Sequence, residues 1–142
     1  MPVRILLIAI GGGLGSIARY SLGKAWPDSN HPLPLTTLGI NLLGSFLLGI
    51  LVVAVTEVWT DAHPNVRPFL GTGILGGFTT FSTFAVQEQN LSAGHALSYL
   101  VLSEAGGILL AAAGMLLMRA LNPRRHIVPT NMQETTIDPD LP

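Results

Sequence analysis

Polar side chains recur at every fourth position of the apolar segment 95–118. His95, Tyr99 and Ser103 follow one another at this spacing, and Gly107 takes the next position. Because residues four apart lie on one face of a helix, the pattern predicts a polar stripe along one wall. An ion that has lost its hydration shell needs polar groups in its place, and a row of hydroxyls could supply them. The same hydroxyls could instead hydrogen-bond a packed neighbouring helix, and the spacing is compatible with both interpretations.

Two further groups of side chains could act in the same way. Thr37 and Asn41 are four residues apart and therefore share one helix face. A buried asparagine serves either as an N–H donor lining a pore or as a link between helices. Phe81 and Phe84 are three residues apart, with hydroxyl side chains interleaved. Such a pair commonly packs in a core or faces lipid, but here it directly follows a predicted helix break.

Two ionisable residues lie inside apolar segments. Arg19 is near the end of the first segment, where an arginine either extends its side chain to the membrane surface or takes part in function. Glu104 lies in the middle of the last segment, where a charge is costly and marks a candidate functional site. It could be kept protonated by burial or be paired with a donor such as Arg19.

The composition indicates how these side chains are positioned. The 142 residues are 49% hydrophobic and only 11% charged, with a mean hydropathy of +0.53. A soluble domain carries about a quarter charged residues, so we predict an all-α integral membrane protein of one domain, residues 1–120. Its four spans are expected at about residues 4–24, 35–57, 68–90 and 95–119. The polar residues 121–142, with four prolines, are expected to be a disordered tail.

The third span is predicted to be broken in the middle of the membrane. Gly71, Gly73, Gly76 and Gly77 precede Phe78-Thr79-Thr80, and these residues form helices poorly. A helix break at membrane depth is tolerated where the freed backbone is buried or lines a watery cavity, and such breaks often build ion sites. We therefore expect the functional centre there.

Several classes of function are excluded or disfavoured. The chain has no cysteine, and its four histidines lack metal-ligand spacing. No nucleophile–base pair is visible, so we do not expect an enzyme. A net charge of −1 gives no case for a nucleic-acid partner. Four spans place both termini on one side, which holds five arginines against one arginine and one lysine on the other, so we expect cytoplasmic termini.

Three stretches together resemble one family. Residues 76–84, GGFTTFSTF, resemble the signature of the Fluc fluoride channels, also called CrcB proteins. Residues 41–49, NLLGSFLLG, resemble the second-helix motif of that family, and the first glycine cluster followed by Ala18-Arg19-Tyr20 resembles its first helix. The resemblance covers about residues 4–118, and the combination of motifs is specific.

The resemblance implies a fluoride-selective channel that lets toxic fluoride leave the cell passively across the inner (plasma) membrane. It implies an antiparallel, dual-topology homodimer with two pores. Phe81 and Phe84 would be the pore phenylalanines and Asn41 the pore amide. The remaining roles implied are Thr37, Ser82 and Thr83 assisting that amide, Tyr99 and Ser103 forming a polar track, Arg19 at the entrance, and main-chain carbonyls of Gly76 and Thr79 holding a structural sodium ion at the dimer centre.

Two departures from the family pattern stand out. Gly107 occupies a position that often carries a third hydroxyl, which a water or another group could replace. Glu104 is not part of the pattern, and we expect it to be neutral or turned away from the pore. The alternatives are a small proton-coupled four-helix exporter that uses Glu104, and a non-transporting assembly subunit. The latter would give no reason for a break in the third span.

Overall fold

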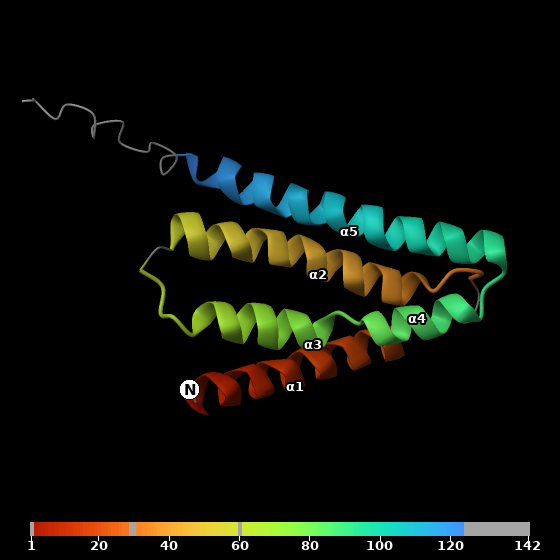
Figure 1. Cartoon of the computed structure of the whole chain (residues 1–142), viewed down its shortest axis with the longest axis horizontal. Helices are drawn as coiled ribbons and strands as arrows, with labels where there is room; N and C mark the ends of the chain where they lie inside the picture. Colours follow the sequence, from red (N-terminus) through yellow and green to blue (C-terminus); the bar gives the residue numbers. More distant parts are fainter. Residues whose placement is uncertain (1, 29–30, 60, 124–142) are drawn as a thin grey trace, which may run out of the picture.

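The protein is a bundle of long helices that run side by side (Figure 1). The structure is a computed structural model that describes residues 2–28, 31–59 and 61–123. Its helical elements are α1 (Pro2–Ala25), α2 (Leu35–Val53), the π-helical η1 (Ala54–Val58), the π-helical η2 (Pro68–Leu75), α3 (Gly76–Phe78), α4 (Phe81–Gln89) and α5 (Ala93–Leu121). Most of the predicted tail, from residue 124 onward, lies outside the described residues.

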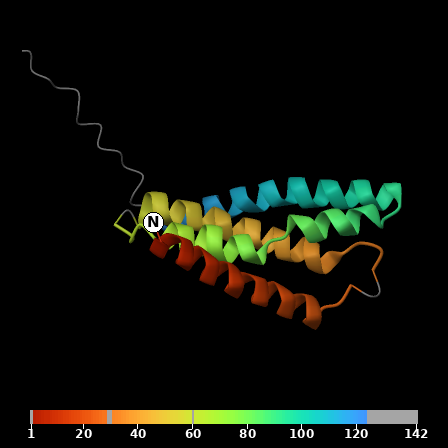
Figure 2. The same cartoon turned by 60° about the horizontal axis from the view of Figure 1, so that its bottom comes forward.

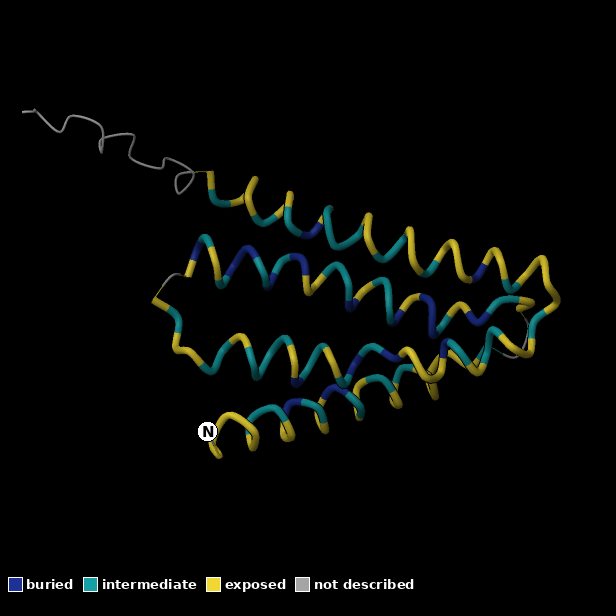
Figure 3. The backbone as a smooth tube through the Cα atoms, in the orientation of Figure 1, coloured by how far each residue is buried: buried dark blue, intermediate teal, exposed yellow. Residues whose placement is uncertain are grey.

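The expectation of four apolar segments long enough to cross a membrane is confirmed. Among the described residues they are Pro2–Ala25, Leu35–Val58, Pro68–Gln89 and Ala93–Leu121. Buried residues concentrate in α2, whereas α1 and α5 keep most of their surface exposed (Figure 3). In a bilayer these exposed apolar faces lie against lipid or another protein chain.

Glycines let the helices approach one another closely. A Cβ on Gly15 of α1 would lie 2.7 Å from the backbone nitrogen of Phe78 and would overlap the carbonyl oxygen of Ile74. A Cβ on Gly49 of α2 would overlap the carbonyl oxygen of Ala111 in α5. Small residues therefore set two backbone contacts, α1 against η2 and α3, and α2 against α5. Figure 2 shows α1 lying along η2 and α3 and diverging from α2 toward Ala25.

The glycine-rich stretch of the third segment is helical, and only two residues after it are not. Gly71 and Gly73 lie in η2, and Gly76 and Gly77 begin α3. Two extended threonines follow, Thr79 (φ −73°, ψ 161°) and Thr80 (φ −150°, ψ 120°), before α4 begins at Phe81. The glycines had been expected to weaken the helix; instead two of them face α1, where Gly73 and Gly77 would overlap or crowd its backbone if they carried a side chain.

The two ends of the bundle carry different connections. The start of α1, the loop after η1 and the end of α5 gather at one end (Figure 1). There Arg119 of α5 forms an ion pair with Glu57 of η1, with 2.6 Å between Nη2 and Oε1. This arrangement places Arg4, Arg67 and Arg119 at the end opposite Lys24.

Candidate functional site

Asn41 of α2 holds the two extended residues between α3 and α4. Its side-chain nitrogen donates to the carbonyl oxygen of Thr80 at 3.0 Å, and its side-chain oxygen accepts from the backbone N–H of Thr80 at 2.8 Å. The amide thus satisfies both polar backbone groups of a buried residue. One of its two N–H bonds remains for another acceptor.

Thr80 also caps the N-terminus of α4. Its hydroxyl accepts from the backbone N–H of Thr83 at 3.2 Å, which is an N-cap, and bonds to the hydroxyls of Thr83 at 3.0 Å and Ser82 at 3.3 Å. The hydroxyl side chains of residues 80, 82 and 83 therefore form one cluster at the N-terminus of α4.

Two backbone carbonyls lose their helical donors through these contacts. In a continuous helix the N–H of Thr80 would bond to Gly76 and that of Thr83 to Thr79. Here the first donates to Asn41 and the second to the hydroxyl of Thr80. The carbonyl oxygens of Gly76 and Thr79 are therefore freed from the helical pattern. These are the two carbonyls that the family resemblance assigned to sodium.

A groove of about 480 Å³ opens beside these residues, between α2, α4 and α5. Its lining includes the chemically distinctive side chains Asn41, Ser45, Phe81, Phe84, Ser103 and Glu104, and we call it the aromatic groove. Gly76, Thr79 and Thr80 line it as well. Hydrogen-bond donors, aromatic rings and the residues whose backbone carbonyls left the helical pattern therefore line the same groove.

The two phenylalanines differ in exposure. Phe81 is 75% exposed, and Phe84 is only 4% exposed. Their ring centroids are 5.8 Å apart with the planes tilted by 38°. Phe84 also packs on Tyr99 of α5, at 4.9 Å and 36°. Aromatic quadrupoles favour tilted pairs of this kind, so Phe84 is fixed while Phe81 stands at the open side of the groove.

The stripe on α5 divides into residues with different partners. Tyr99 is fully buried, and its hydroxyl donates to the side-chain oxygen of Gln87 at 3.2 Å. Ser103 is the one residue in the described part of the chain with a buried side-chain oxygen or nitrogen that has no hydrogen-bond partner. A native structure rarely leaves such a group unpaired without a functional reason or a bound species.

Ser45 supplies a hydroxyl beside Gly107. A Cβ on Gly107 would lie 3.3 Å from the Ser45 hydroxyl oxygen, and both residues line the aromatic groove. The hydroxyl of Ser45 therefore lies beside the position on α5 where the family pattern often has a third hydroxyl. Sequence reasoning did not single out Ser45, although it lies one helical turn after Asn41.

The remaining predicted residues line a different cavity. Arg19, Thr37, Ser82 and Thr83 surround a polar space of about 440 Å³ between α1, α2 and α4, which we call the polar cavity. Asp28 and Gln87 line it too. Thr80 lines both spaces and separates them. The predicted site thus forms two adjoining compartments, and sequence reasoning missed the roles of Thr80 and Gln87.

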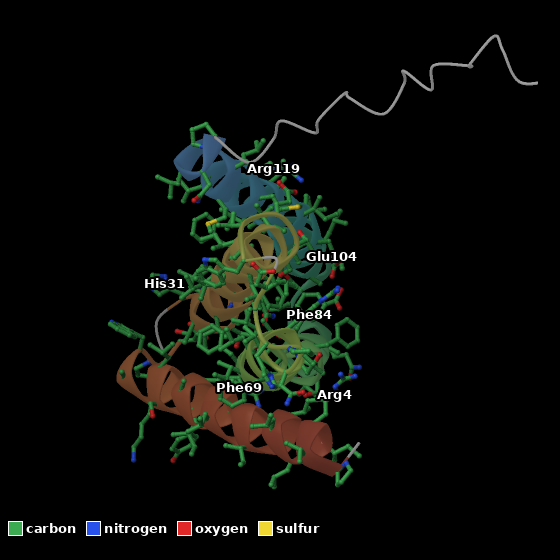
Figure 4. The ribbon with its side chains drawn as sticks, turned by 90° about the vertical axis from the view of Figure 1, so that its left-hand side faces the viewer. Arg4, His31, Phe69, Phe84, Glu104 and Arg119 are labelled. Atoms are coloured by element: carbon green, nitrogen blue, oxygen red, sulfur yellow. The ribbon has the colours of Figure 1, made fainter. Side chains whose placement is uncertain are left out.

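Glu104 lies on the wall of the aromatic groove. Ser103 and Glu104 of α5 both line this groove, and Glu104 is exposed in the single chain. The expectation that Glu104 is neutral or turned away from the pore stays a prediction. Arg19 lines the polar cavity instead, and among the described residues of one chain it forms no ion pair with Glu104. Figure 4 shows Glu104 and Phe84 on the side of the bundle away from His31.

Four apolar helices around such compartments define a multi-pass helical membrane protein. The family model described as "CrcB-like protein, Camphor Resistance (CrcB)" matches residues 6–115. The chain belongs to the CrcB family, and the resemblance drawn from its motifs is confirmed.

Curated relatives carry the name of an ion channel. The chain is 49% identical over 100 residues to "Fluoride-specific ion channel FluC 2" of Streptomyces avermitilis, covering 68% of this chain and 63% of that protein. It is 42% identical over 120 residues to the protein of the same name from Nocardia farcinica, covering 82% of each. It is 44% identical over 121 residues to "Fluoride-specific ion channel FluC" of Leptospira interrogans, covering 81% of this chain and 94% of that protein. The match thus spans less than two thirds of the Streptomyces relative.

Proposed function

We propose that this protein is a fluoride-selective channel through which fluoride leaves the cell passively across the inner membrane. The observation that carries the proposal is the aromatic groove, where the rings of Phe81 and Phe84 stand beside Asn41 and the unpaired hydroxyl of Ser103. The printed names of the relatives support the same function.

The chemistry of the groove suits a small, strongly hydrated anion. Fluoride must exchange its water for other donors, and Asn41 keeps one N–H available while Ser103 and Ser45 offer hydroxyls. The edges of aromatic rings are positive, so Phe81 and Phe84 can face an anion while their bulk excludes water. No fixed cation lines the aromatic groove, which keeps the anion from binding too tightly to leave. Arg19 in the polar cavity would attract fluoride at an entrance.

A second, antiparallel copy would complete the pathway. Phe81 is 75% exposed at the open side of the groove, where an isolated chain would present a membrane-depth cavity to lipid. A two-fold symmetric homodimer would enclose two such grooves. In this arrangement η2–α3 and α4 are two halves of one span that is interrupted at Thr79–Thr80 in the middle of the membrane.

A sodium ion at the dimer centre fits the backbone at this interruption. Sodium prefers oxygen ligands, and the carbonyl oxygens of Gly76 and Thr79 have lost their helical donors, which bond elsewhere. Two copies related by a two-fold axis would supply four such oxygens. The ion's charge would hold the two interruptions together.

The experiment that tests this function is fluoride efflux from liposomes that contain the purified protein, with equal pH on both sides. We expect rapid loss of fluoride, no comparable loss of chloride, and abolition of the flux by Phe81→Ile, which removes the ring edge but keeps an apolar side chain. A folded protein that releases no fluoride would overturn the proposal.

A proton-coupled exporter is the second candidate, because Glu104 lines the groove. The same liposomes distinguish the two. A channel passes fluoride without a proton gradient, whereas an exporter requires the gradient and loses its activity with Glu104→Gln.

A further inference from the structure

A third space opens between α1 and α2, where the two helices diverge toward the loop that joins them (Figure 2). Its volume is about 520 Å³. Most of its walls are apolar, and its rim is polar. We call it the apolar wedge, and its lining includes Leu22, Trp26, Asp28, Gly39, Ile40 and Leu43.

The apolar wedge lies on a different face of α2 from the aromatic groove. Gly39 lines the wedge and Asn41 lines the groove, and two helical residues advance by about 200° around the axis. Figure 4 shows His31, which also lines the wedge, on the side of the bundle away from Glu104. A second copy placed over the aromatic groove would therefore leave the wedge open to lipid.

The wedge extends from the membrane surface into the apolar layer. One apolar segment ends at Ala25 and the next begins at Leu35, so the loop between them, with Trp26 and Asp28, lies at the membrane–water boundary. Trp26 is 65% exposed, and tryptophan favours this boundary. Leu43 lies eight helical residues beyond Leu35, about 12 Å deeper. The wedge thus spans the level of a lipid headgroup and of the upper part of its acyl chain.

A carboxylate is held in place at the rim of the wedge. The Oδ1 atom of Asp28 accepts from the backbone N–H of Thr36 at 2.8 Å, and the Thr36 hydroxyl donates to the carbonyl oxygen of Trp26. Within the described part of the chain Asp28 makes no other hydrogen bond and no ion pair, although Arg19 shares the polar cavity with it. Its second oxygen therefore remains an acceptor for a cationic donor.

We propose that the apolar wedge binds a phospholipid whose headgroup carries a primary ammonium group, such as phosphatidylethanolamine. An acyl chain lies between Leu22 and Leu43, and the ammonium group donates to the carboxylate of Asp28. His31 at the rim and Lys24 in the last turn of α1 offer donors to the lipid phosphate. A trimethylammonium headgroup has no N–H to donate, and a headgroup with no cation is repelled by Asp28.

The test uses the two tryptophans of the chain, which lie at opposite ends of the bundle. Trp59→Phe leaves Trp26 as the reporter of the wedge, and Trp26→Phe leaves Trp59 as the control. Each protein is reconstituted in phosphatidylcholine vesicles that contain increasing fractions of a brominated phospholipid, which quenches tryptophan on contact. We expect brominated phosphatidylethanolamine to associate at Trp26 about two- to fivefold more strongly than brominated phosphatidylcholine or phosphatidylglycerol. Trp59 should show no preference for ethanolamine over choline.

Two substitutions, made in the Trp59→Phe protein, test the two parts of the site. Asp28→Asn keeps the side-chain oxygen that accepts from Thr36 but removes the charge, so the preference for ethanolamine should disappear. A Cβ on Gly39 meets no atom within 4 Å, so Gly39→Leu fills the wedge without a clash and should also abolish the preference. Gly94→Leu is the matched control, because Gly94 of α5 is equally open but does not line the wedge.

Three results would overturn the inference. The first is equal quenching of Trp26 by all three headgroups, and the second is a preference that survives Asp28→Asn. The third is a Trp26 that no brominated lipid quenches, which would mean that another protein chain covers the wedge. If a substituted protein is not recovered folded, the comparison of headgroups in the Trp59→Phe protein decides the question, because it changes no residue of the wedge.

Discussion

Replacing Asn41 by alanine tests whether this residue holds the interruption between α3 and α4. The substitution removes two hydrogen bonds, of 3.0 Å and 2.8 Å, from the backbone of Thr80. Each bond contributes about 0.5–1.5 kcal/mol, and a buried polar group left without a partner costs about 1–3 kcal/mol. Because Thr80 is buried, we expect Asn41→Ala to lower the free energy of unfolding by about 2–4 kcal/mol.

The assay is reversible unfolding by SDS in mixed micelles, followed by circular dichroism, together with fluoride efflux from liposomes. Asn41→Asp keeps the acceptor for the Thr80 N–H but sets a second oxygen against the Thr80 carbonyl, so it should destabilise as well. Thr56→Val is the matched control. It removes a hydroxyl that bonds to Val52 within its own helical segment, and it should change stability by less than about 0.5 kcal/mol.

The reasoning would be refuted by an Asn41→Ala protein that loses fluoride flux while its unfolding free energy stays within about 0.5 kcal/mol of the original. In that case the amide acts on the ion alone, as the family resemblance implied. Loss of stability together with altered flux would show that Asn41 holds the backbone on which the groove is built.

Two further predictions concern the packing and capping of the helices. Gly15→Ala places a Cβ against the backbone of Ile74 and Phe78, so we expect a loss of folded protein in size-exclusion chromatography, whereas Gly12→Ala meets no atom within 4 Å and should be recovered normally. Thr80→Val removes the N-cap of α4 and should cost about 1 kcal/mol in the same SDS titration, while Thr80→Ser retains the hydroxyl and should cost less. Equal recovery of Gly15→Ala and Gly12→Ala would contradict the described packing of α1. Equal stability of Thr80→Val and Thr80→Ser would contradict the N-cap of α4.

The sequence predicted the helices well because their signal is local. A membrane span needs about 20 apolar residues, and this requirement can be counted directly along the chain. The second segment, with no charge from Leu35 to Thr56, corresponds to a helix from Leu35 to Val58. The motif around Phe81 and Phe84 was also readable, because its residue order is specific.

The roles of individual residues were less predictable, because they depend on which backbone lies opposite. Asn41 was expected to be a pore amide, and its side chain bonds to Thr80, 39 residues away. Glu104 and Ser103 are neighbours in sequence, but only the packing of α5 on α2 and α4 places both on the aromatic groove. The order of residues along the chain does not show which residues of another helix lie opposite them.

By itself the sequence determined that this chain forms four apolar membrane-spanning helices, that it belongs to the CrcB family, and that its polar and aromatic residues concentrate near one interruption. The tertiary structure decided that most of the predicted site residues line two separate compartments, that the Ser45 hydroxyl lies beside Gly107, and that Glu104 lines the aromatic groove. The physical reason is that hydropathy and helical periodicity act within about one helical turn. Hydrogen-bond partners and cavity walls instead arise between helices, whose separation is set by glycines such as Gly15 and Gly49.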